Sequence, residues 1–349
     1  MHSSHLPRIA SLATAVPPHV LDTPQVVVET AKIFGRYGDE FHRMASVFSN
    51  AGIDRRYSVC PTEWFHSQSS WPDRSSRFLD GATSLFREVA LKALVDAHLT
   101  SSEIDVIVSV SSTGIATPSI EAHVMHDMGF RHDVMRVPIF GLGCAGGVSG
   151  LAVASQLAAA YPGRKVLLVV IELCTLAFRP DEMSKSNIIA SALFGDGAAA
   201  LVLSVEADGP AIEHAGQHCW PGTIDIMGWR IDDEGFGAIF SRSIPDLALK
   251  DLRPAADGFL TRHGLQLKDM ERFSFHPGGA KVIAALETAF ELGQGRLQDE
   301  RKILAGFGNM SAPTVLFVLQ QALQRQETGR RFVGSLGPGF TASFMTLVD

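Results

Sequence analysis

Three side chains that can perform acyl-transfer chemistry lie at glycine-rich turns of this 349-residue chain. Cys144 belongs to a Gly-Cys-Ala-Gly-Gly motif and opens an apolar stretch with the composition of a helix. At a helix N-terminus a thiol meets unpaired backbone N–H groups and the positive end of the helix dipole, so we expect a lowered pKa and a nucleophilic thiolate. The alternative is a buried, inert cysteine, the commoner state of this residue type.

His276 ends an apolar stretch and precedes Pro-Gly-Gly, a turn that can expose its ring. A neutral imidazole there can accept the Cys144 proton, although a single histidine is more often structural. Asn309 belongs to a Gly-Asn-Met-Ser motif, and its amide can donate to a developing oxyanion or cap the following helix. Together the three residues suit acyl transfer to sulfur, followed by stabilisation of an enolate or oxyanion.

A spacing of 165 positions occurs twice: it separates Cys144 from Asn309, and Ser111 from His276. We expect each member of the first pair to follow an apolar strand, and each member of the second to close one. The spacing therefore indicates a duplicated unit. A polar segment rich in turn residues, 206–210, marks the boundary between a first half, 1–208, with the cysteine and a second half, 209–349, with the histidine and asparagine.

The pattern of apolar residues predicts alternating helices and strands, hence an α/β fold with right-handed crossovers and covered sheets. For the first half we expect helices over 23–36, 76–98 and 144–161 and strands over 104–110, 135–140, 165–171 and 198–203. For the second half we expect helices over 254–264, 280–291 and after Asn309, and strands over 271–275, 303–307 and 341–348.

The composition excludes several classes of function. A net charge of −7 and a pI near 6.0 argue against nucleic-acid binding. We find no apolar run of the roughly 18 residues that a membrane span needs, and so expect no stable membrane insertion. The four cysteines form neither a disulfide framework nor a Cys-x-x-Cys pair, so we expect no zinc or other metal site. The N-terminus lacks the pattern of a signal peptide, and we expect a cytoplasmic protein.

Five motifs in this order resemble those of the type III polyketide synthases, the chalcone-synthase-like branch of the thiolase superfamily. They are Gly-Cys-Ala-Gly-Gly, Leu-Phe-Gly-Asp-Gly-Ala-Ala (193–199), His-Pro-Gly-Gly, Gly-Asn-Met-Ser and Gly-Pro-Gly (337–339). The resemblance covers residues 8–349. It implies a thiolase-like fold of two pseudo-duplicated αβαβα halves, a homodimer, and a reaction that needs no metal or organic cofactor.

By this resemblance Cys144 accepts a starter acyl group from its CoA thioester. His276 and Asn309 then promote decarboxylation of malonyl-CoA, and the resulting enolate attacks the acyl-cysteine. The runner-up is a β-ketoacyl-acyl-carrier-protein synthase of the third class, which stops after one condensation. That family usually has Gln-Ala-Asn after the histidine and Gly-Asn-Thr-Ser at the asparagine, where this chain has Pro-Gly-Gly and Met310. A scaffold without catalysis is the third reading.

The resemblance also names residues around the substrate, each of which can alternatively be ordinary core. Phe194 matches a gatekeeper aromatic, and its partner position falls on Ala238, where plant members have Phe. The smaller side chain would widen an apolar passage, which favours a fatty acyl starter and an alkylpyrone or alkylresorcinol product. Trp229, where plant members have Gly, argues for less space. The other expected cavity residues are Cys174, Ser112, Thr117, Gly337, Pro338 and Gly339.

For the CoA moiety the resemblance indicates basic residues near the phosphates. Arg55 and Arg56 occupy such a position, because a planar guanidinium suits phosphate, although a solvated surface pair is equally compatible. Lys281, Gly278 and Ser311 are the further candidates.

Overall fold

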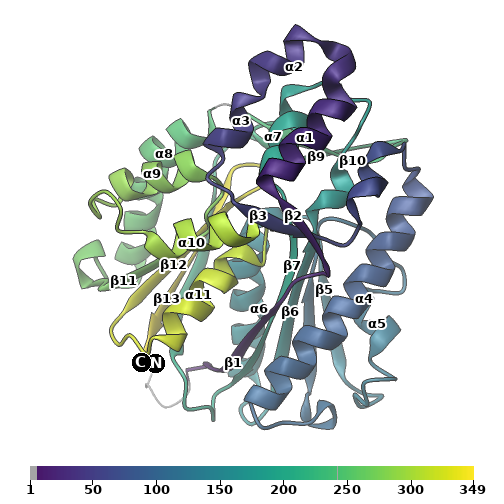
Figure 1. Ribbon diagram of the computed structural model, residues 1–349. Coiled ribbons are helices and arrows are strands. Elements are labelled where there is room, and N and C mark those ends of the chain that lie inside the picture. The colour runs from purple at the N-terminus through teal and green to yellow at the C-terminus, as the bar shows by residue number, and fades with distance from the viewer. Residues whose placement is uncertain (1–5, 242) are drawn as a thin grey trace.

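The computed structural model describes residues 6–241 and 243–349, so part of the N-terminal stretch considered above lies outside it. Its main feature is a nine-stranded sheet in the order β11-β12-β13-β8-β1-β7-β6-β4-β5 (Figure 1). The first half of the chain supplies β1 (Arg8–Ala15), β4 (Val106–Val110), β5 (Met135–Ile139), β6 (Val166–Leu173) and β7 (Asp196–Ser204). The second half supplies β8 (Ala211–Cys219), β11 (Arg272–Phe275), β12 (Arg331–Gly337) and β13 (Thr341–Val348).

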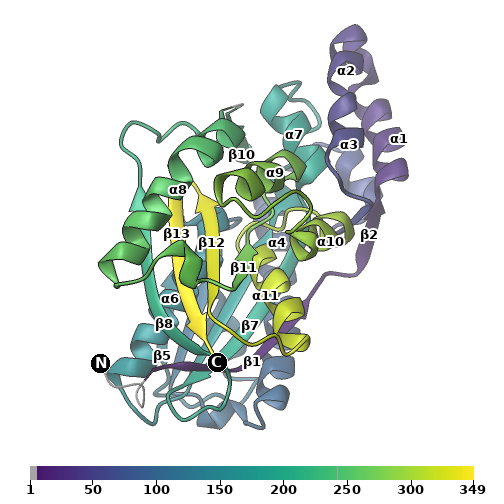
Figure 2. The ribbon, with the colours of Figure 1, turned by 90° about the vertical axis from the view of Figure 1, so that its left-hand side faces the viewer.

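Helices cover each half of this sheet, and two further helices pack against strands of both halves. α4 (Trp71–Asp96) and α5 (Ile120–Val124) lie on the first half, and α8 (Ile244–Arg262) and α9 (Ala280–Ala289) on the second (Figure 2). α6 (Gly146–Ala160) and α11 (Thr314–Gln324) share one hydrophobic core with strands of both halves. The mixed α/β architecture with a central helical layer is the predicted thiolase-like fold.

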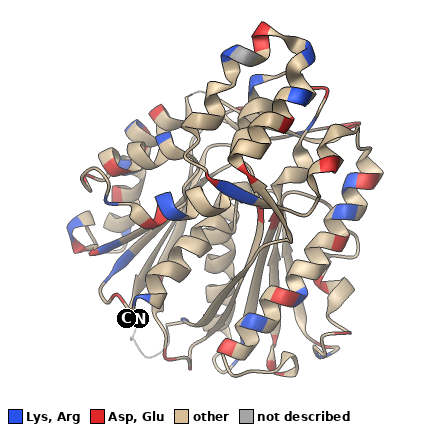
Figure 3. Cartoon of the chain, viewed as in Figure 1, with Lys and Arg blue, Asp and Glu red and all other residues tan. Residues whose placement is uncertain are grey.

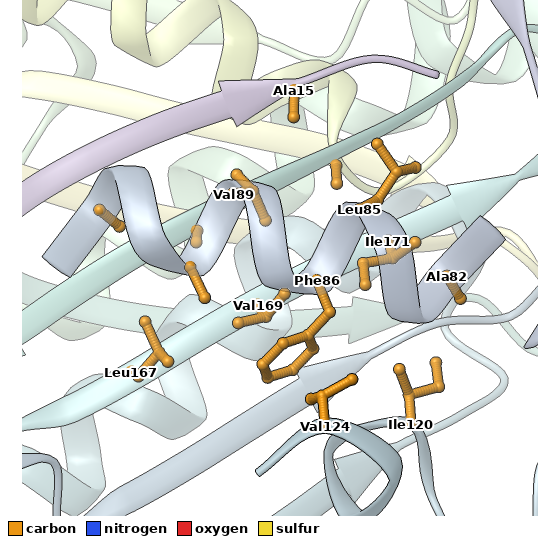
Figure 4. Close-up of a cluster of buried hydrophobic side chains, with 14 of the residues drawn as sticks. Ala15, Ala82, Leu85, Phe86, Val89, Ile120, Val124, Leu167, Val169 and Ile171 are labelled. Atoms are coloured by element: carbon orange, nitrogen blue, oxygen red, sulfur yellow. The ribbon is translucent and has the colours of Figure 1, made fainter. Parts of the chain in front are cut away.

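β6 shows why the sequence folds into layers. All eight of its residues are buried, as a strand covered on both faces requires. Leu167, Val169 and Ile171 face α4, where Phe86 and Val89 pack on them (Figure 4). The alternate residues of the strand join α6 and α11 in the other core. A strand with period-two geometry thus holds one helix layer on each side.

The remaining elements lie around one end of the sheet. α1 (Thr23–Phe34), α2 (Asp39–Met44) and α3 (Ser46–Asn50) project there, above the two-stranded antiparallel sheet of β2 (His19–Asp22) and β3 (Arg55–Ser58) (Figure 1). α7 (Lys185–Leu193), the hairpin of β9 (Met227–Asp232) and β10 (Gly235–Phe240), and α10 (Gln298–Phe307) complete the chain.

Two sequence expectations are corrected. The strand predicted over 303–307 is wrong, because these residues end α10, with Ile303 and Leu304 buried and Lys302 exposed at helical spacing. A short apolar run fits either structure. The segment Gly143–Ala160 is long and apolar enough to cross a membrane by length and composition, contrary to our expectation, but 67% of it is buried inside the protein.

Candidate active site

The turn before α6 is built to hold Cys144 in place. Gly143–Ala145 form a short 3₁₀ helix, and Gly143 has a φ of 45°, a conformation that favours glycine. The Ser112 hydroxyl accepts hydrogen bonds from the N–H groups of Gly141 (3.2 Å) and Gly143 (3.0 Å). Ser112, expected to line the cavity, therefore uses its hydroxyl to fix the turn that carries Cys144.

The Cys144 thiol is buried, with 8% of the residue exposed. Burial raises its pKa to about 12, while hydrogen bonds with Ser311 and Asn309 act in the opposite direction. Our expectation of a lowered pKa is therefore wrong for this thiol taken alone, because desolvation of a thiolate outweighs the helix end. The Cys144 thiol can therefore form a thiolate near neutral pH only if a partner takes its proton.

His276 lies directly after β11, and its N–H donates to the carbonyl of Gly334 on β12 at 2.9 Å. The residue is 4% exposed, and neither ring nitrogen has a hydrogen-bond partner in the described part of the chain. Burial lowers the pKa of His276 to about 3, so its imidazole is neutral. A Cβ at Gly278 would touch this ring, lying 3.8 Å from Nε2. The ring is thus neutral and buried, and its two nitrogens have unused hydrogen-bonding capacity.

Asn309 connects these two groups. Its Nδ2 donates to the Gly278 carbonyl (3.2 Å), two residues after His276, and its Oδ1 accepts from the Ser311 N–H (2.8 Å). An amide nitrogen carries two hydrogens, and the second is available to the Cys144 thiol, whose pKa a hydrogen bond from Asn309 lowers. Asn309 does not cap α11, because that helix begins at Thr314 with Pro313 at its cap position.

Glu172 is a buried acid that the sequence analysis missed. Its Oε2 accepts from the Ser112 N–H at 2.9 Å, and its Oε1 has no partner among the described residues. Burial raises its pKa to about 8, and its charge in turn raises the pKa of Cys144. The signal was visible, since Glu172 is the one charged residue of the apolar strand β6.

Aromatic rings pack around Phe194. Phe194 is buried together with Cys174, Ala190 and Ala238, and Trp229 packs against this cluster. The Phe194 and Trp229 ring centroids are 5.6 Å apart. The passage that we expected to be widened at Ala238 is occupied, because Trp229 stands opposite Ala238 in the β9–β10 pair.

A cavity with about 600 Å³ of empty space, part of it open to solvent, lies beside this cluster. Its lining comes from α1, β3, α7 and the segments 62–65 and 174–178, and most of it is apolar. Cys174 and Phe194 belong both to the lining and to the aromatic cluster. Cys174, one of these shared residues, is close enough to Cys144 for the Cys144 charge to affect the pKa of Cys174, whereas Cys144, His276 and Asn309 are not among the described lining residues.

The predicted Gly-Pro-Gly loop lies at the Cys144 turn. A Cβ at Gly337 would lie 2.6 Å from the Ala145 Cβ, and one at Gly143 would lie 2.7 Å from Pro338. Gly339, with a φ of 63°, takes the left-handed conformation that glycine allows. Thr117, by contrast, is exposed.

Comparison with known proteins decides the family. Residues 43–208 match the model for the N-terminal domain of chalcone and stilbene synthases, and residues 211–347 match that for the C-terminal domain. A putative chalcone synthase of Bacillus subtilis is 36% identical over 97% of both chains. The chain belongs to the chalcone and stilbene synthase family. It is a type III polyketide synthase, an acyltransferase-type condensing enzyme.

Two further relatives of the synthase agree with this assignment. The 1,3,6,8-tetrahydroxynaphthalene synthase of Streptomyces peucetius is 35% identical, over 97% of this chain and 92% of that one. The crystal structure of the Streptomyces coelicolor enzyme of the same name superposes with a TM-score of 0.93 at 27% identity, covering 98% and 99% of the two chains.

The residues expected to bind CoA lie in different surroundings. Arg56 of the synthase is 4% exposed and donates to the carbonyls of Ala192 (2.6 Å) and Ser191, and burial lowers its pKa to about 10. It stabilises the end of α7, so we no longer propose it as a phosphate ligand. Ser311 lies beside the Cys144 thiol. Arg55 and Lys281 are exposed and remain candidates for binding the CoA phosphates. The arginines of β3 give this strand its blue colour in Figure 3.

Proposed function

We propose that this synthase loads an acyl group from a CoA thioester onto Cys144 and extends it with malonyl-CoA. The observation that carries this proposal is the buried His276 ring with two unpartnered nitrogens, in one site with a buried thiol and an asparagine amide. A buried polar group without a partner is costly, so such a ring indicates a site completed by its substrate.

In the loading step His276 accepts the Cys144 proton, and the thiolate attacks the thioester carbonyl. The new carbon–sulfur bond forms as the bond to the CoA sulfur breaks. The departing CoA thiolate takes the proton from His276. The imidazole is neutral, as a proton acceptor must be at the start of this step. The negative charge that develops on the Cys144 sulfur stabilises the imidazolium as it forms.

In the extension step the malonyl carboxylate leaves as CO₂, and its bonding electron pair passes into the thioester enolate. The second N–H of the Asn309 amide, released from the Cys144 sulfur once this carries the acyl group, and the His276 ring stabilise the enolate oxygen. The enolate carbon then attacks the acyl-Cys144 carbonyl, and the cysteine sulfur leaves. The electrons balance without a metal or organic cofactor, and we propose that none is used.

The starter we propose is a fatty acyl group, and the product an alkylpyrone or alkylresorcinol. An apolar cavity that begins at Cys174 and Phe194 supports an alkyl chain as its occupant. Incubation with radiolabelled malonyl-CoA and a panel of acyl-CoA thioesters tests this proposal, with products identified by mass. A preference for short aromatic starters would contradict it.

A single condensation, as in a β-ketoacyl synthase of the third class, remains the alternative. The same labelled assay decides between the two. Release of one β-ketoacyl product, with an acyl carrier protein as the better malonyl donor, would favour that alternative. Pyrone or resorcinol products, which need more than one extension, would exclude it.

We also propose a homodimer. β5 is the edge strand of the nine-stranded sheet, and Met135, Ile115 and Phe140 near it are 41%, 56% and 52% exposed. An apolar sheet edge of this kind favours a second copy as its cover. Light scattering of the purified protein measures the mass, and Phe140→Glu should lower it to that of one chain.

A further inference from the structure

We infer that Glu300 is a positioning residue, which fixes the placement of His276 relative to Asn309. The inference rests on the proposed function, because it concerns the two groups proposed to hold the enolate oxygen. Glu300 lies on α10, outside every motif of the sequence analysis. It acts through these two residues and touches no substrate.

The Glu300 side chain supplies a hydrogen-bond acceptor that the sheet lacks beside β11. β11 is the edge strand of the nine-stranded sheet, next to β12 (Figure 1). Successive N–H groups of a strand point to opposite sides, and that of His276 points to β12, where it donates to the Gly334 carbonyl. The N–H of Phe275 therefore points to the open edge, where it donates to the Glu300 Oε1 at 2.9 Å.

Burial makes this hydrogen bond hard to replace. Glu300 is 2% exposed and Phe275 is 1% exposed. A buried N–H group without an acceptor is costly, so the edge of β11 is stable at this point only while Glu300 meets it. Burial also raises the pKa of Glu300 to about 7, so that its neutral and charged forms are both present near neutral pH. Each form keeps an oxygen that can accept from Phe275.

The helix that carries Glu300 leads directly to Asn309. Glu300 lies in the first turn of α10, and the helix ends at Phe307. The Gly308 N–H then donates to the Leu304 carbonyl at 2.9 Å, and Asn309 is the next residue. Because an α-helix is held by a hydrogen bond at every residue, a contact that fixes its first turn also constrains the residue that follows its last turn.

Hydrogen bonds on both sides of His276 join its segment to the segment of Asn309. Before the histidine, Phe275 donates to Glu300; after it, the Asn309 Nδ2 donates to the Gly278 carbonyl at 3.2 Å. One hydrogen bond leaves two segments free to pivot about it, whereas a second one at a distance removes that freedom. Glu300 therefore provides the second point of attachment.

The placement of the two groups matters more for one half-reaction than for the other. In the extension step His276 and Asn309 hold the same enolate oxygen, whereas in the loading step His276 takes the proton of Cys144. A misplacement of about 1 Å can cost on the order of 10²-fold in a step that needs both groups aligned. Loss of the Glu300 contact should therefore slow decarboxylation more than loading.

The test compares three substitutions of Glu300 with a matched control. Glu300→Leu removes the acceptor, Glu300→Asp draws it back by one methylene group, and Glu300→Gln keeps an oxygen for the Phe275 N–H. Glu287→Leu is the control, because Glu287 is also a buried acid, 4% exposed, that accepts a backbone N–H, that of Leu297 at 3.0 Å. Release of labelled CO₂ from malonyl-CoA and trapping of labelled acyl-Cys144 give the two rates.

We expect Glu300→Leu to lower the ratio of the decarboxylation rate to the loading rate by at least about tenfold, and Glu300→Asp by at least about fivefold. Glu300→Gln should keep this ratio within about twofold of wild type, and Glu287→Leu should leave it unchanged. In an Asn309→Ala background, Glu300→Leu should change the ratio by less than about threefold, because the pair of groups that it aligns is gone.

Thermal unfolding shows which variants are folded, and Glu300→Asp decides if Glu300→Leu is not. An unchanged ratio in the folded variant, a loss in Glu300→Gln or Glu287→Leu as large as that in Glu300→Leu, or an undiminished loss in the Asn309→Ala background would overturn the inference. Failure of the proposed function looks different, because wild type would then neither release CO₂ from malonyl-CoA nor form acyl-Cys144.

Discussion

Asn309 and Phe194 are paired through their backbones, with hydrogen bonds of 2.8 and 3.1 Å on the two sides of Phe194. The pair joins segments from the two halves of the chain. It places Asn309, whose amide we propose to hold the enolate, next to Phe194, whose ring lines the apolar cavity. The residue proposed for chemistry and a residue proposed for substrate binding are thus neighbours.

Removal of the Asn309 amide should separate the two half-reactions. In Asn309→Ala we expect decarboxylation of malonyl-CoA to fall by about 10²–10³-fold, while loading of the starter changes by less than about tenfold. Release of labelled CO₂ and trapping of labelled acyl-enzyme measure the two. Asn50→Ala, which removes an exposed amide, serves as control. Equal losses in both steps would contradict the assigned role.

The reactivity of Cys144 should depend on His276 in a way that pH reveals. Transfer of the thiol proton to the imidazole changes no net charge, so alkylation by iodoacetamide should vary little between about pH 6 and 9. In His276→Ala the thiol is alone, with its pKa raised by burial to about 12, and the rate should rise about tenfold per pH unit. Identical pH profiles would show that His276 does not take the proton. Cys144→Ser should load no acyl group.

Glu172→Gln should stabilise the protein at alkaline pH. Burial raises the pKa of Glu172 from 4.5 to about 8, so the folded state binds this proton more tightly than the unfolded state. Its contribution to stability is fully present below pH 4.5 and is lost as the pH rises through about 8. Glu172→Gln lacks this loss, so its free energy of unfolding at pH 8 should exceed that of wild type by a few kcal/mol.

Urea unfolding of both proteins from about pH 4 to 9 measures the difference between their free energies of unfolding. Taking this difference cancels the contributions of the other buried acids, which both proteins share. Glu88→Gln, on the exposed side of α4, should give no pH-dependent difference. A constant difference between Glu172→Gln and wild type across this range would show that Glu172 does not titrate as its burial predicts.

The crossing of α6 and α11 gives a prediction for stability. A Cβ at Gly147 would lie 2.3 Å from the Ala312 carbonyl oxygen, so Gly147→Ala should lower the free energy of unfolding by about 3 kcal/mol or more. Gly306 lies in α10 with no atom near its Cβ direction, and Gly306→Ala should raise it by about 0.5–1 kcal/mol. Chemical denaturation measures both, and a tolerated Gly147→Ala would show that the helices can move apart.

The repeated spacing of 165 positions predicted part of the site correctly. Ser111 follows β4 and His276 follows β11, as expected. Cys144 and Asn309 both lie on glycine turns, but a helix rather than a strand precedes Asn309. The spacing identifies equivalent positions, but a five-residue apolar run such as 303–307 fits a helix as well as a strand. The division at residue 208 stays a prediction.

Other features depend on contacts between distant segments. Arg55 and Arg56 read as one basic pair, yet alternation along β3 exposes the first and buries the second. In the sequence, Ala238 predicts a wider passage and Trp229 a narrower one. Only the register of the β9–β10 hairpin shows that the two residues lie opposite each other. The ring nitrogens of His276 and the Oε1 of Glu172 have no hydrogen-bond partner among the described residues. This too depends on the surrounding elements and cannot be predicted from the sequence.

The most direct test of the account locates the acyl group on the protein. Wild-type enzyme is incubated with a fatty acyl-CoA alone, quenched in acid and digested with trypsin, which places Cys144 and Cys174 on separate peptides, 137–164 and 166–185. We predict a mass increase of one acyl group on the peptide with Cys144 and none on the other. An acyl group on Cys174, or on no cysteine, would contradict the account.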